Sequence, residues 1–482
     1  MKPVVVLFMA LLVALTSIGT ADPGLPVPLA QTIDHFLTER VTDWEIPGMA
    51  LVIVQGDRVI YNKAFGLSDL ERNVLMTTHT PIAIGSTTKA MTALAVMQLV
   101  DRHQLDLDEP IHHYLPWFEL ADERGQSITT RQILSHSSGL PPSYDLVEAQ
   151  DPDALEQAVR ELSNTYLQFS PGERFQYTND GFNLAGMLIQ QVSGMPYEDY
   201  MAQNIFAPLQ MNDSTFDPVL AEEHGLAQCY AWGYSPPMPR SLTFSRSDNP
   251  AGMLVASSTD IGRYFSALLN RGHVDDQVVI SETALQQMWS PIVAVYGSND
   301  TSYGLGWFIT GGDLPILFHS GDRYCSGSDF VLFPDRQLAI GLLTNFRSSV
   351  QLRFELLQSV AATVLFLGEP HQAFETSSTR IASRESDPSL WSGYLGSYTS
   401  AAGAIEISMA DNRLVGSMLD SEFDLIPYSD TRFTIHSATP ALDGLELEFV
   451  VREQGSFGSL PGRVINTGRL LLMNWQFGYK RE

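Results

Sequence analysis

The sequence predicts an α/β domain whose antiparallel sheet is built from both ends of that domain, followed by a small all-β barrel domain. Strand-like runs occupy residues 50–65 and return at residues 304–344, and the stretch between them is mostly helical. Residues 368–389 are low in apolar content and rich in Ser and Thr, which is typical of a linker. Beyond them, apolar and polar residues alternate as in half-buried antiparallel strands. We therefore expect helices to flank the first sheet and a mainly helical subdomain to be inserted into it.

The first domain is expected to begin with a helix and a β-hairpin. Apolar residues recur at helical intervals over 29–41. Two β-rich runs, at 50–54 and 59–65, are joined through Gly56-Asp57, which is typical of a hairpin turn. Residues 86–100 are rich in Ala, Met and Leu and are apolar on most faces, so they predict a helix buried at the centre of the domain.

The second half of this domain predicts two helices and a further group of strands. One helix is expected over 259–269, capped by Ser258 or Thr259. Another, over 352–367, is expected to close the domain. Between them lie short β-rich runs separated by turn residues, at 304–310, 317–319, 329–333 and 338–344.

The N-terminal segment is typical of a cleaved secretory signal. Lys2 precedes an unbroken apolar run from Val4 to Leu15, and Gly19-Thr20-Ala21 then resembles a signal-peptidase site. The run of 12 residues is shorter than the ~20 that span a bilayer, so a retained anchor is the weaker alternative. We expect an exported protein, periplasmic or secreted, without stable membrane insertion after cleavage. The predicted parts are a signal peptide at 1–21, a main domain at 28–367, a linker at 368–389 and a small all-β domain at 390–482.

Charge and cysteine content exclude several classes of protein. The chain has 28 Lys and Arg residues against 55 Asp and Glu residues, a formal net charge of −27. This excess repels nucleic-acid phosphates, and no basic stretch offers an exception, so nucleic-acid partners are excluded. Cys229 and Cys325 are the only cysteines, which excludes a cysteine-based zinc site or disulfide scaffold. A single bridge and two unpaired thiols are both compatible with the sequence.

Ser86 and Lys89 lie where a loop turns into the predicted buried helix. Positions i and i+3 share a helix face, so Lys89 can bring its ammonium to the Ser86 hydroxyl. A helix N-terminus also offers backbone N–H groups that stabilise an oxyanion. This arrangement suits a nucleophilic serine, although an isolated Ser-x-x-Lys more often marks an ordinary helix cap.

Two later motifs add polar groups suited to proton transfer and substrate binding. Tyr177-Thr178-Asn179 precedes a predicted helix at 182–192. A Lys and a Tyr can share the removal of a serine proton, and Asn179 can both donate and accept hydrogen bonds. His319-Ser320-Gly321 lies on a predicted strand whose backbone could supply a second oxyanion donor, and its His could donate to substrate or transfer a proton. Taken singly, each motif is equally compatible with a structural role.

In their order and spacing, the three motifs resemble those of the serine β-lactamase and penicillin-binding-protein superfamily. The resemblance is to the branch related to class C β-lactamases, D-aminopeptidases and similar esterases, and it covers about residues 29–367. Residues 394–398, Tyr-Leu-Gly-Ser-Tyr, resemble the opening of lipocalin-like domains appended to some members. Supporting segments lie at 84–100, 105–108, 133–141, 250–254 and 303–307.

The resemblance implies an acyl-enzyme mechanism. Ser86 would be acylated by a substrate carbonyl, Lys89 and Tyr177 would handle protons, and Asn179 would hold the substrate or Lys89. The backbone N–H groups of Ser86 and Asp322 would form the oxyanion hole, beside His319 and Gly321 in the substrate-binding set. The implied protein is a serine hydrolase acting on an ester, amide (D-amino-acid peptide) or lactam in a small molecule or peptide. Neither a cofactor nor a metal is expected.

Two departures from the family pattern bear on activity. Many β-lactamases of this superfamily have Lys where this chain has His319, and a neutral His binds a β-lactam carboxylate less well. This favours an esterase or peptidase over a true β-lactamase. Asp322 stands where relatives often have Gly, and its carboxylate would oppose an oxyanion unless it points away or pairs, for instance with Arg323. With the extra β-domain, Asp322 supports an alternative function, a non-catalytic β-lactamase-fold binding or regulatory protein.

Overall fold

The computed structural model describes most of the chain from residue 24 to residue 366 and shorter pieces beyond it. Within the described part, no helix is both long and apolar enough to cross a membrane. The predicted signal peptide (1–21) and the predicted linker (368–389) lie outside the described residues. The described ranges are 24–143, 148–231, 237–274, 277–295, 301–311, 315–347, 350–366, 391, 395–400, 403–410, 413–418, 421–427, 432–437, 446–448 and 463–465.

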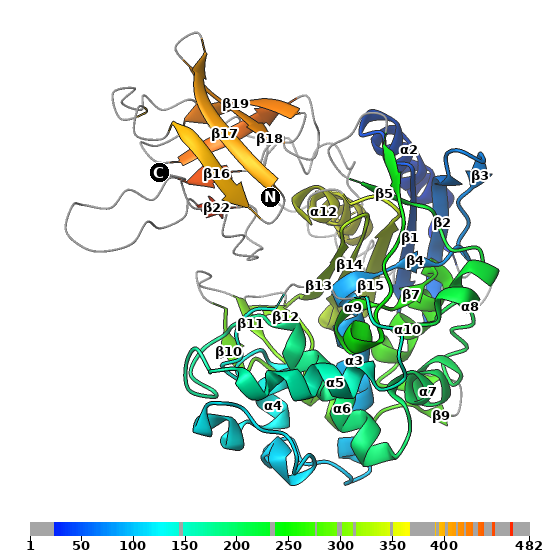
Figure 1. Cartoon of the computed structure of the whole chain (residues 1–482). Coiled ribbons are helices and arrows are strands. Elements are labelled where there is room, and N and C mark those ends of the chain that lie inside the picture. Colours follow the sequence, from blue (N-terminus) through cyan, green and yellow to red (C-terminus); the bar gives the residue numbers. More distant parts are fainter. Residues whose placement is uncertain are drawn as a thin grey trace, which may run out of the picture.

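A nine-stranded antiparallel sheet forms the frame of the first domain (Figure 1), in the order β10-β11-β12-β13-β14-β15-β1-β2-β3. The N-terminal strand β1 (Gly48–Gln55) pairs on one side with β2 (Arg58–Asp69) and on the other with β15 (Leu338–Thr344). The prediction of a sheet built from both ends of the domain is confirmed. The remaining strands are β3 (Val74–Leu75), β10 (Val293–Ala294), β11 (Thr301–Tyr303), β12 (Phe308–Thr310), β13 (Leu317–Arg323) and β14 (Ser326–Phe333).

Helices cover both faces of this sheet, which explains why the adjacent strands β1 and β15 are almost entirely apolar and buried. Along β1, Val52 and Val54 pack into a core shared with α10 (Ser258–Leu269) and α3 (Thr88–Asp101). The alternate residues Met49, Leu51 and Ile53 face a second core, formed with α2 (Val27–Asp43) and α12 (Val350–Phe366). Strand β1 therefore contributes to two hydrophobic layers.

The segment inserted between the two groups of strands is mainly helical, as predicted. Its α-helices are α4 (Thr130–Leu134), α5 (Ala154–Glu161), α6 (Asn179–Ser193), α7 (Tyr197–Met201), α8 (Pro218–Glu223), α9 (Asn249–Gly252), α10 and α11 (Glu282–Met288). Short paired strands also occur there: β4 (Ile82–Ala83) with β7 (Val255–Ala256), β5 (Cys229–Ala231) with β6 (Met238–Arg240), and β8 (His273–Val274) with β9 (Gln277–Val278). Short 3₁₀ turns lie at Gly85–Thr87 (η1), Ile111–His113, Glu123–Ser127, Leu162–Asn164, Arg246–Asp248 (η6) and Pro334–Arg336, and a π-helical turn lies at Ala202–Phe206.

The structure differs from the sequence-based prediction at one strand, one helix cap and one helix start. Residues 304–310 do not form one strand, because Gly304 N donates to Trp307 O and Gly306 adopts φ +79°, which makes a turn between β11 and β12. The cap of α10 is Ser257 rather than Ser258 or Thr259, since the Ser257 side chain accepts from Asp260 N. Helix α6 begins at Asn179, three residues before the predicted start.

The C-terminal region contains the predicted antiparallel strands. Seven of them pair in chain order, and among the described residues β22 does not pair back to β16, so the described strands form an open sheet where a barrel was expected. Of the apolar residues in the predicted alternating pattern, Ile407 is buried, whereas Met409 is 40% exposed. Leu414 and Phe423, which that pattern did not include, are also buried. The strands are β16 (Gly396–Ser400), β17 (Gly403–Ala410), β18 (Arg413–Met418), β19 (Ser421–Pro427), β20 (Arg432–Ser437), β21 (Glu446–Glu448) and β22 (Arg463–Ile465).

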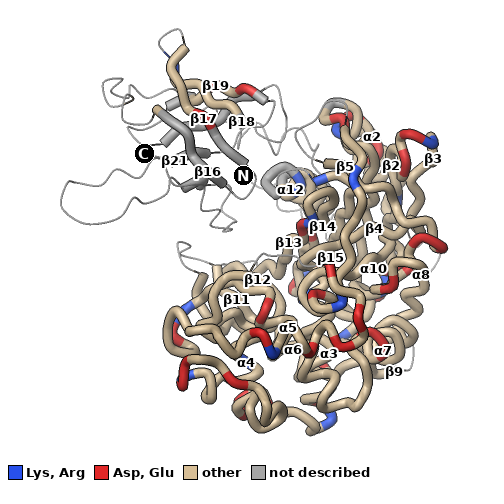
Figure 2. The backbone as a smooth tube through the Cα atoms, viewed as in Figure 1, with Lys and Arg blue, Asp and Glu red and all other residues tan. Residues whose placement is uncertain are grey.

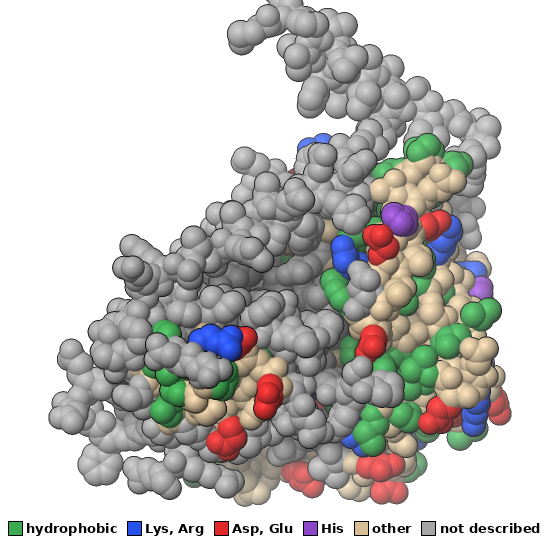
Figure 3. Space-filling view, turned by 90° about the horizontal axis from the view of Figure 1, so that it is seen from above, with side chains coloured by type: hydrophobic (Ala, Val, Ile, Leu, Met, Phe, Trp, Pro, Cys, Tyr) green, Lys and Arg blue, Asp and Glu red, His purple; other side chains and the backbone are tan. Residues whose placement is uncertain are grey.

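Charged side chains are distributed over many elements of the first domain. Figure 2 shows Asp and Glu on helices and loops around the sheet, with Lys and Arg interspersed. The face in Figure 3 mixes hydrophobic, acidic and basic side chains among its described atoms. The acidic excess is therefore spread along the chain.

Candidate active site

Ser86 lies in the turn between β4 and α3, at the edge where this turn meets β13. The turn requires Gly85, which adopts φ +57° and whose Cβ, if it had one, would lie 2.7 Å from Asp322 N. Gly321 is equally constrained, because a Cβ there would lie 1.9 Å from Ile84 O. Ser86 and Asp322 directly follow these two glycines, so the structure brings their backbones together.

Two side-chain hydrogen bonds from β14 fix the backbone that leads into the same turn. Ser328 Oγ donates to Ile84 O at 2.6 Å, and Ser326 Oγ donates to Ala83 O at 2.8 Å. Both serines are buried, and so are all the residues around Ser86 in the turn, whereas Ser86 itself is partly exposed. The turn thus presents the Ser86 hydroxyl on a rigid support.

Lys89 lies one helical turn after Ser86, and its side chain is fully buried. Its Nζ is 3.2 Å from Ser86 Oγ, 2.8 Å from Asn179 Oδ1 and 2.7 Å from the carbonyl oxygen of Ala251. Asn179 begins α6 and Ala251 belongs to α9, so three separate helices meet at this amine.

Burial lowers the pKa of Lys89 to about 7, although the nearby Asp248 carboxylate raises it. At neutral pH a large fraction of Lys89 is therefore an uncharged amine. A neutral amine has two N–H donors and one lone pair. The amide oxygen of Asn179 and the Ala251 carbonyl are both acceptors and take the two donors, so the lone pair is left for the hydroxyl of Ser86.

Tyr177 lies beside Lys89 on the segment that leads into α6. The Lys89 amine is 4.9 Å from the centroid of the Tyr177 ring, and the Tyr177 ring is 6.3 Å from that of His319. Residues of the three sequence motifs therefore lie close together in the structure.

His319 lies on β13 with its side chain buried. Its Nδ1 is 2.8 Å from Ser320 O, an acceptor, and its Nε2 is 3.0 Å from the hydroxyl of Tyr303. Burial and the charge of Lys89 lower the pKa of His319 to about 3, so the ring is neutral at physiological pH. Both ring nitrogens of His319 therefore already have hydrogen-bond partners in the protein, so this residue supports the neighbouring residues of the site.

His136 is a residue of this site that sequence reasoning did not single out. Its ring lies 4.1 Å from that of Tyr177, its Nδ1 accepts from Thr178 N, and its carbonyl accepts from Gln176 N. It thus contacts Tyr177 and both chain neighbours. Burial lowers its pKa well below the usual value, which keeps the ring neutral. Its φ of +56° is uncommon outside Gly, and a sequence pattern does not reveal it.

Comparison with known proteins places this geometry in a family. The family model described as Beta-lactamase matches residues 31–365, which is more than half of the chain. The chain belongs to the Beta-lactamase family. The match covers the sheet, the helical insertion and every site residue named above, so the resemblance of the first domain to the serine β-lactamase and penicillin-binding-protein superfamily is confirmed. The lipocalin-like resemblance of residues 394–398 lies outside the match and stays a prediction.

Relatives of this Beta-lactamase family member include penicillin-binding proteins. The chain is 29% identical over 323 residues to Protein flp of Staphylococcus aureus (strain MW2), a match that covers 66% of this chain and 63% of that protein's length. It is 25% identical over 453 residues to Penicillin-binding protein 4* of Bacillus subtilis (strain 168), a match that covers 88% of this chain and 94% of that protein's length. The solved structure of the octameric penicillin-binding protein homologue from Pyrococcus abyssi shares the fold, with a TM-score of 0.63 and 21% identity. The match covers 87% of this chain and 96% of that one. The family carries a serine hydrolase type of function.

The carboxylate of Asp322 is paired in this family member, but not with the partner that the sequence suggested. Arg353 Nη2 is 2.9 Å from Asp322 Oδ1, whereas Arg323 donates to the carbonyl oxygen of Thr243. The expectation of an Arg323 pair was wrong because consecutive strand residues point to opposite faces of the sheet.

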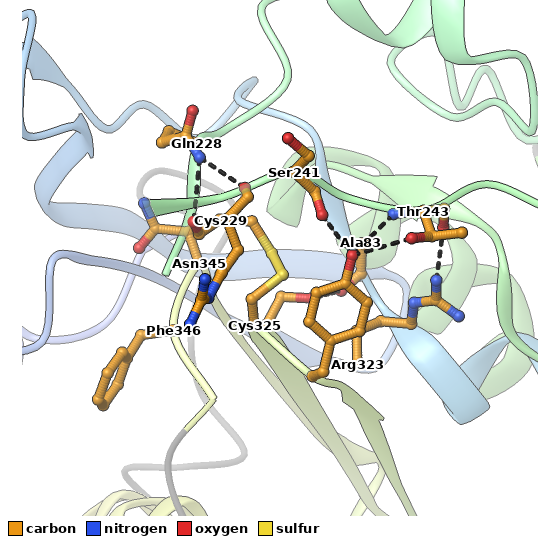
Figure 4. The surroundings of a disulfide bond; sticks show 12 residues. Ala83, Gln228, Cys229, Ser241, Thr243, Arg323, Cys325, Asn345 and Phe346 are labelled. Carbon is orange, nitrogen blue, oxygen red and sulfur yellow. Dashed lines mark hydrogen bonds between the residues drawn. A yellow bond between two sulfur atoms is a disulfide. The ribbon is translucent and has the colours of Figure 1, made fainter. Parts of the chain in front are cut away.

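Cys229 and Cys325 form a disulfide, which resolves the alternatives left by the sequence (Figure 4). The bond joins β5 to the turn of the β13–β14 hairpin, next to Arg323. Tyr230 N also donates to Cys325 O, and the Tyr324 hydroxyl donates to Ser241 O. The hairpin that carries Asp322 is therefore anchored to the 229–243 segment. Within the described residues, no cluster of three or more His, Cys, Asp or Glu side chains could hold a metal ion.

Proposed function

We propose that this chain is an exported serine hydrolase that acts through an acyl-enzyme at Ser86. The observation that carries the proposal is the buried amine of Lys89, which has a pKa of about 7 and lies 3.2 Å from Ser86 Oγ. A base with this pKa accepts a proton at neutral pH, and its geometry directs the lone pair at the nucleophile.

In the first half-reaction, Ser86 Oγ attacks the substrate carbonyl carbon while its proton passes to Lys89 Nζ. The carbonyl oxygen becomes an oxyanion, which accepts hydrogen bonds from the N–H groups of Ser86 and Asp322. The intermediate then collapses, and the bond from the acyl carbon to the leaving oxygen or nitrogen breaks. The leaving group takes the proton from Lys89, with Tyr177 beside the amine as a second proton-handling group.

In the second half-reaction, water attacks the acyl ester of Ser86. The water proton passes to the same Lys89–Tyr177 pair, and the bond between the acyl carbon and Ser86 Oγ breaks. The acid product leaves, and the proton returns to Ser86 Oγ. Asn179 holds Lys89 in place throughout, because its side-chain oxygen accepts a hydrogen bond from the amine.

The substrates that fit this site are uncharged esters or amides of a small molecule or peptide. A lactam antibiotic carries a carboxylate next to the reacting ring, and a cation on the oxyanion strand favours its binding. His319 supplies no such charge, because it is neutral and both ring nitrogens are occupied. This favours an esterase or peptidase over a β-lactamase. The non-catalytic alternative rested on Asp322 and on the extra β-domain; its first support is weakened, because the Asp322 carboxylate is paired with Arg353.

A substrate comparison tests this function. A short-chain p-nitrophenyl ester, a D-amino-acid amide and a penicillin are assayed under one condition with the wild type and with Ser86→Ala. We expect kcat/KM for the ester or amide to exceed that for the penicillin by at least ~100-fold, and Ser86→Ala to lose at least ~10³-fold. A preference for the penicillin would contradict the substrate class. Turnover insensitive to Ser86→Ala, or no turnover by the folded protein, would favour the non-catalytic alternative.

A further inference from the structure

A buried arginine joins helix α12 to the two strands beneath the oxyanion site. Arg353 Nη2 lies 2.9 Å from Asp322 Oδ1 on β13, and Arg353 Nε lies 2.5 Å from Asp329 Oδ2 on β14. The Arg353 side chain is 1% exposed, as is that of Asp329, and Asp322 is 12% exposed. One guanidinium thus bridges two carboxylates away from water.

The strands are shaped to admit this side chain. Gly327 pairs with Asp322 across the hairpin, and a Cβ at Gly327 would lie 2.5 Å from Arg353 Nη1. Arg353 Nη2 also approaches Gly321 O at 3.5 Å. The guanidinium therefore packs over the hairpin at the residue pair that contains Asp322, whose N–H faces the Ser86 turn.

The charges of this cluster matter because the oxyanion forms next to it. Burial opposes the charge of Arg353, but the Asp322 and Asp329 carboxylates raise its pKa, so it stays a cation. Burial raises the pKa of Asp329 to about 6, and it is still mostly ionised at neutral pH. Without Arg353, two carboxylates would remain unpaired beside a developing negative charge.

We propose that Arg353 is a positioning residue that neutralises the Asp322 carboxylate and fixes β13, so that the Asp322 N–H can serve as an oxyanion donor. This inference rests on the proposed function. It explains how the chain tolerates an acidic residue at the oxyanion strand. It also predicts that the charge of Asp322, and not only the packing of Arg353, determines the effect of losing Arg353.

A charge-removal rescue separates this role from a merely structural one. The variants are Arg353→Gln and Asp322→Asn/Arg353→Gln, measured by kcat and KM for an ester whose turnover Ser86→Ala abolishes. We expect Arg353→Gln to lower kcat about 100-fold with KM changed less than about threefold, because an oxyanion donor is worth 10²–10³-fold in kcat. The double variant should recover at least about 10-fold of that loss. Arg131→Gln, which breaks the surface pair with Asp108, is the matched control and should leave kcat unchanged.

Each outcome decides the inference. It is overturned if Arg353→Gln keeps the wild-type kcat, or if the folded double variant is no faster than Arg353→Gln, since removal of the Asp322 charge would then be without effect. If Arg353→Gln does not fold, Arg353→Lys carries the test, with an expected fall in kcat of about fivefold at unchanged KM; an unchanged kcat overturns the inference. Failure of the proposed function is distinguishable, because the wild type would then show no turnover that Ser86→Ala removes, and the inference would fall with it.

Discussion

At the scale of the residue, the environment of Lys89 lowers the pKa of its amine to about 7. Its amine is buried beside the Ser86 turn, where water does not solvate the charged form of the amine. Two fixed acceptors take two of its hydrogen bonds and leave the third direction to Ser86 Oγ. In the proposed mechanism, the amine is therefore available as a base at neutral pH and lies in position to take the serine proton as the new bond to the carbonyl carbon forms.

This environment predicts a pH dependence. The neutral form of Lys89 is the base, and its fraction falls tenfold for each pH unit below its pKa. We expect kcat/KM for a neutral ester to rise with pH and to level off above an apparent pKa of about 7. In Asp248→Asn the apparent pKa should move down, because the Asp248 carboxylate raises the pKa of Lys89. A pH profile that is flat from 5 to 8, or an upward shift in the variant, would contradict this assignment.

The residues to which the proposed mechanism assigns chemistry could be predicted from the sequence, whereas those whose place in the site depends on backbone conformation could not. Ser86, Lys89, Tyr177 and Asn179 were predicted, because helical spacing and ordered motifs are visible in a sequence. His136 was not singled out, since its role depends on a left-handed backbone and on contacts to a segment about 40 residues further along the chain. The role expected of His319 depended on an open ring nitrogen, and only the structure shows that Tyr303 and Ser320 occupy both.

At the scale of the element, the β13–β14 hairpin is the part of the fold on which the site depends most. It supplies Asp322 and the serines that hold the Ser86 turn, and its tip is joined to β5 by the Cys229–Cys325 disulfide. Anchoring at the tip and at Arg353 limits the movement of the strand on which the oxyanion donor lies.

Removal of this disulfide should lower stability. The bond closes a loop with a sequence separation of 96, and a loop of that length stabilises a fold by about 2–5 kcal/mol, chiefly by restricting the unfolded chain. We expect Cys229→Ser/Cys325→Ser to lower the free energy of unfolding by that amount in urea denaturation. Treatment of the wild type with reductant should give the same midpoint, and the reductant should leave the double variant unchanged. Equal urea midpoints for oxidised wild type and double variant would contradict the expected contribution.

Helices and strands were predicted correctly where one pattern of apolar residues continued along the whole element. The prediction was wrong where a turn interrupted the pattern. The hairpin at β1 and β2 and the buried helix α3 follow from patterns that are local. Residues 304–310 were predicted as one strand because their composition is β-rich, whereas Gly304 and Gly306 place a turn in the middle. The Arg353 cluster was not predicted, because it joins an arginine on α12 to carboxylates 24 and 31 residues earlier in the chain.

At the scale of the whole molecule, the pairing of β1 with β15 explains the architecture. It brings the first and last parts of the domain into one sheet and leaves the intervening helices to pack against that sheet. Ser86 comes from the first part, Asn179 from the insertion and Asp322 from the last part. The active site is therefore completed only when all three regions have folded. The order of strands and helices along the chain made this organisation predictable, whereas barrel closure in the C-terminal region depends on long-range pairing that alternation does not specify.

The proposed mechanism requires a covalent bond to Ser86 Oγ whose formation depends on Lys89, and a phosphonate probe forms such a bond in place of the acyl group. Wild-type protein, Ser86→Ala and Lys89→Ala are treated with a p-nitrophenyl phosphonate, and the adduct is located by intact mass and peptide mapping. We expect one adduct on the peptide that contains Ser86 in the wild type, none in Ser86→Ala and labelling slowed at least ~100-fold in folded Lys89→Ala. An adduct on another residue, or undiminished labelling in either variant, would rule out the acyl-enzyme mechanism at Ser86.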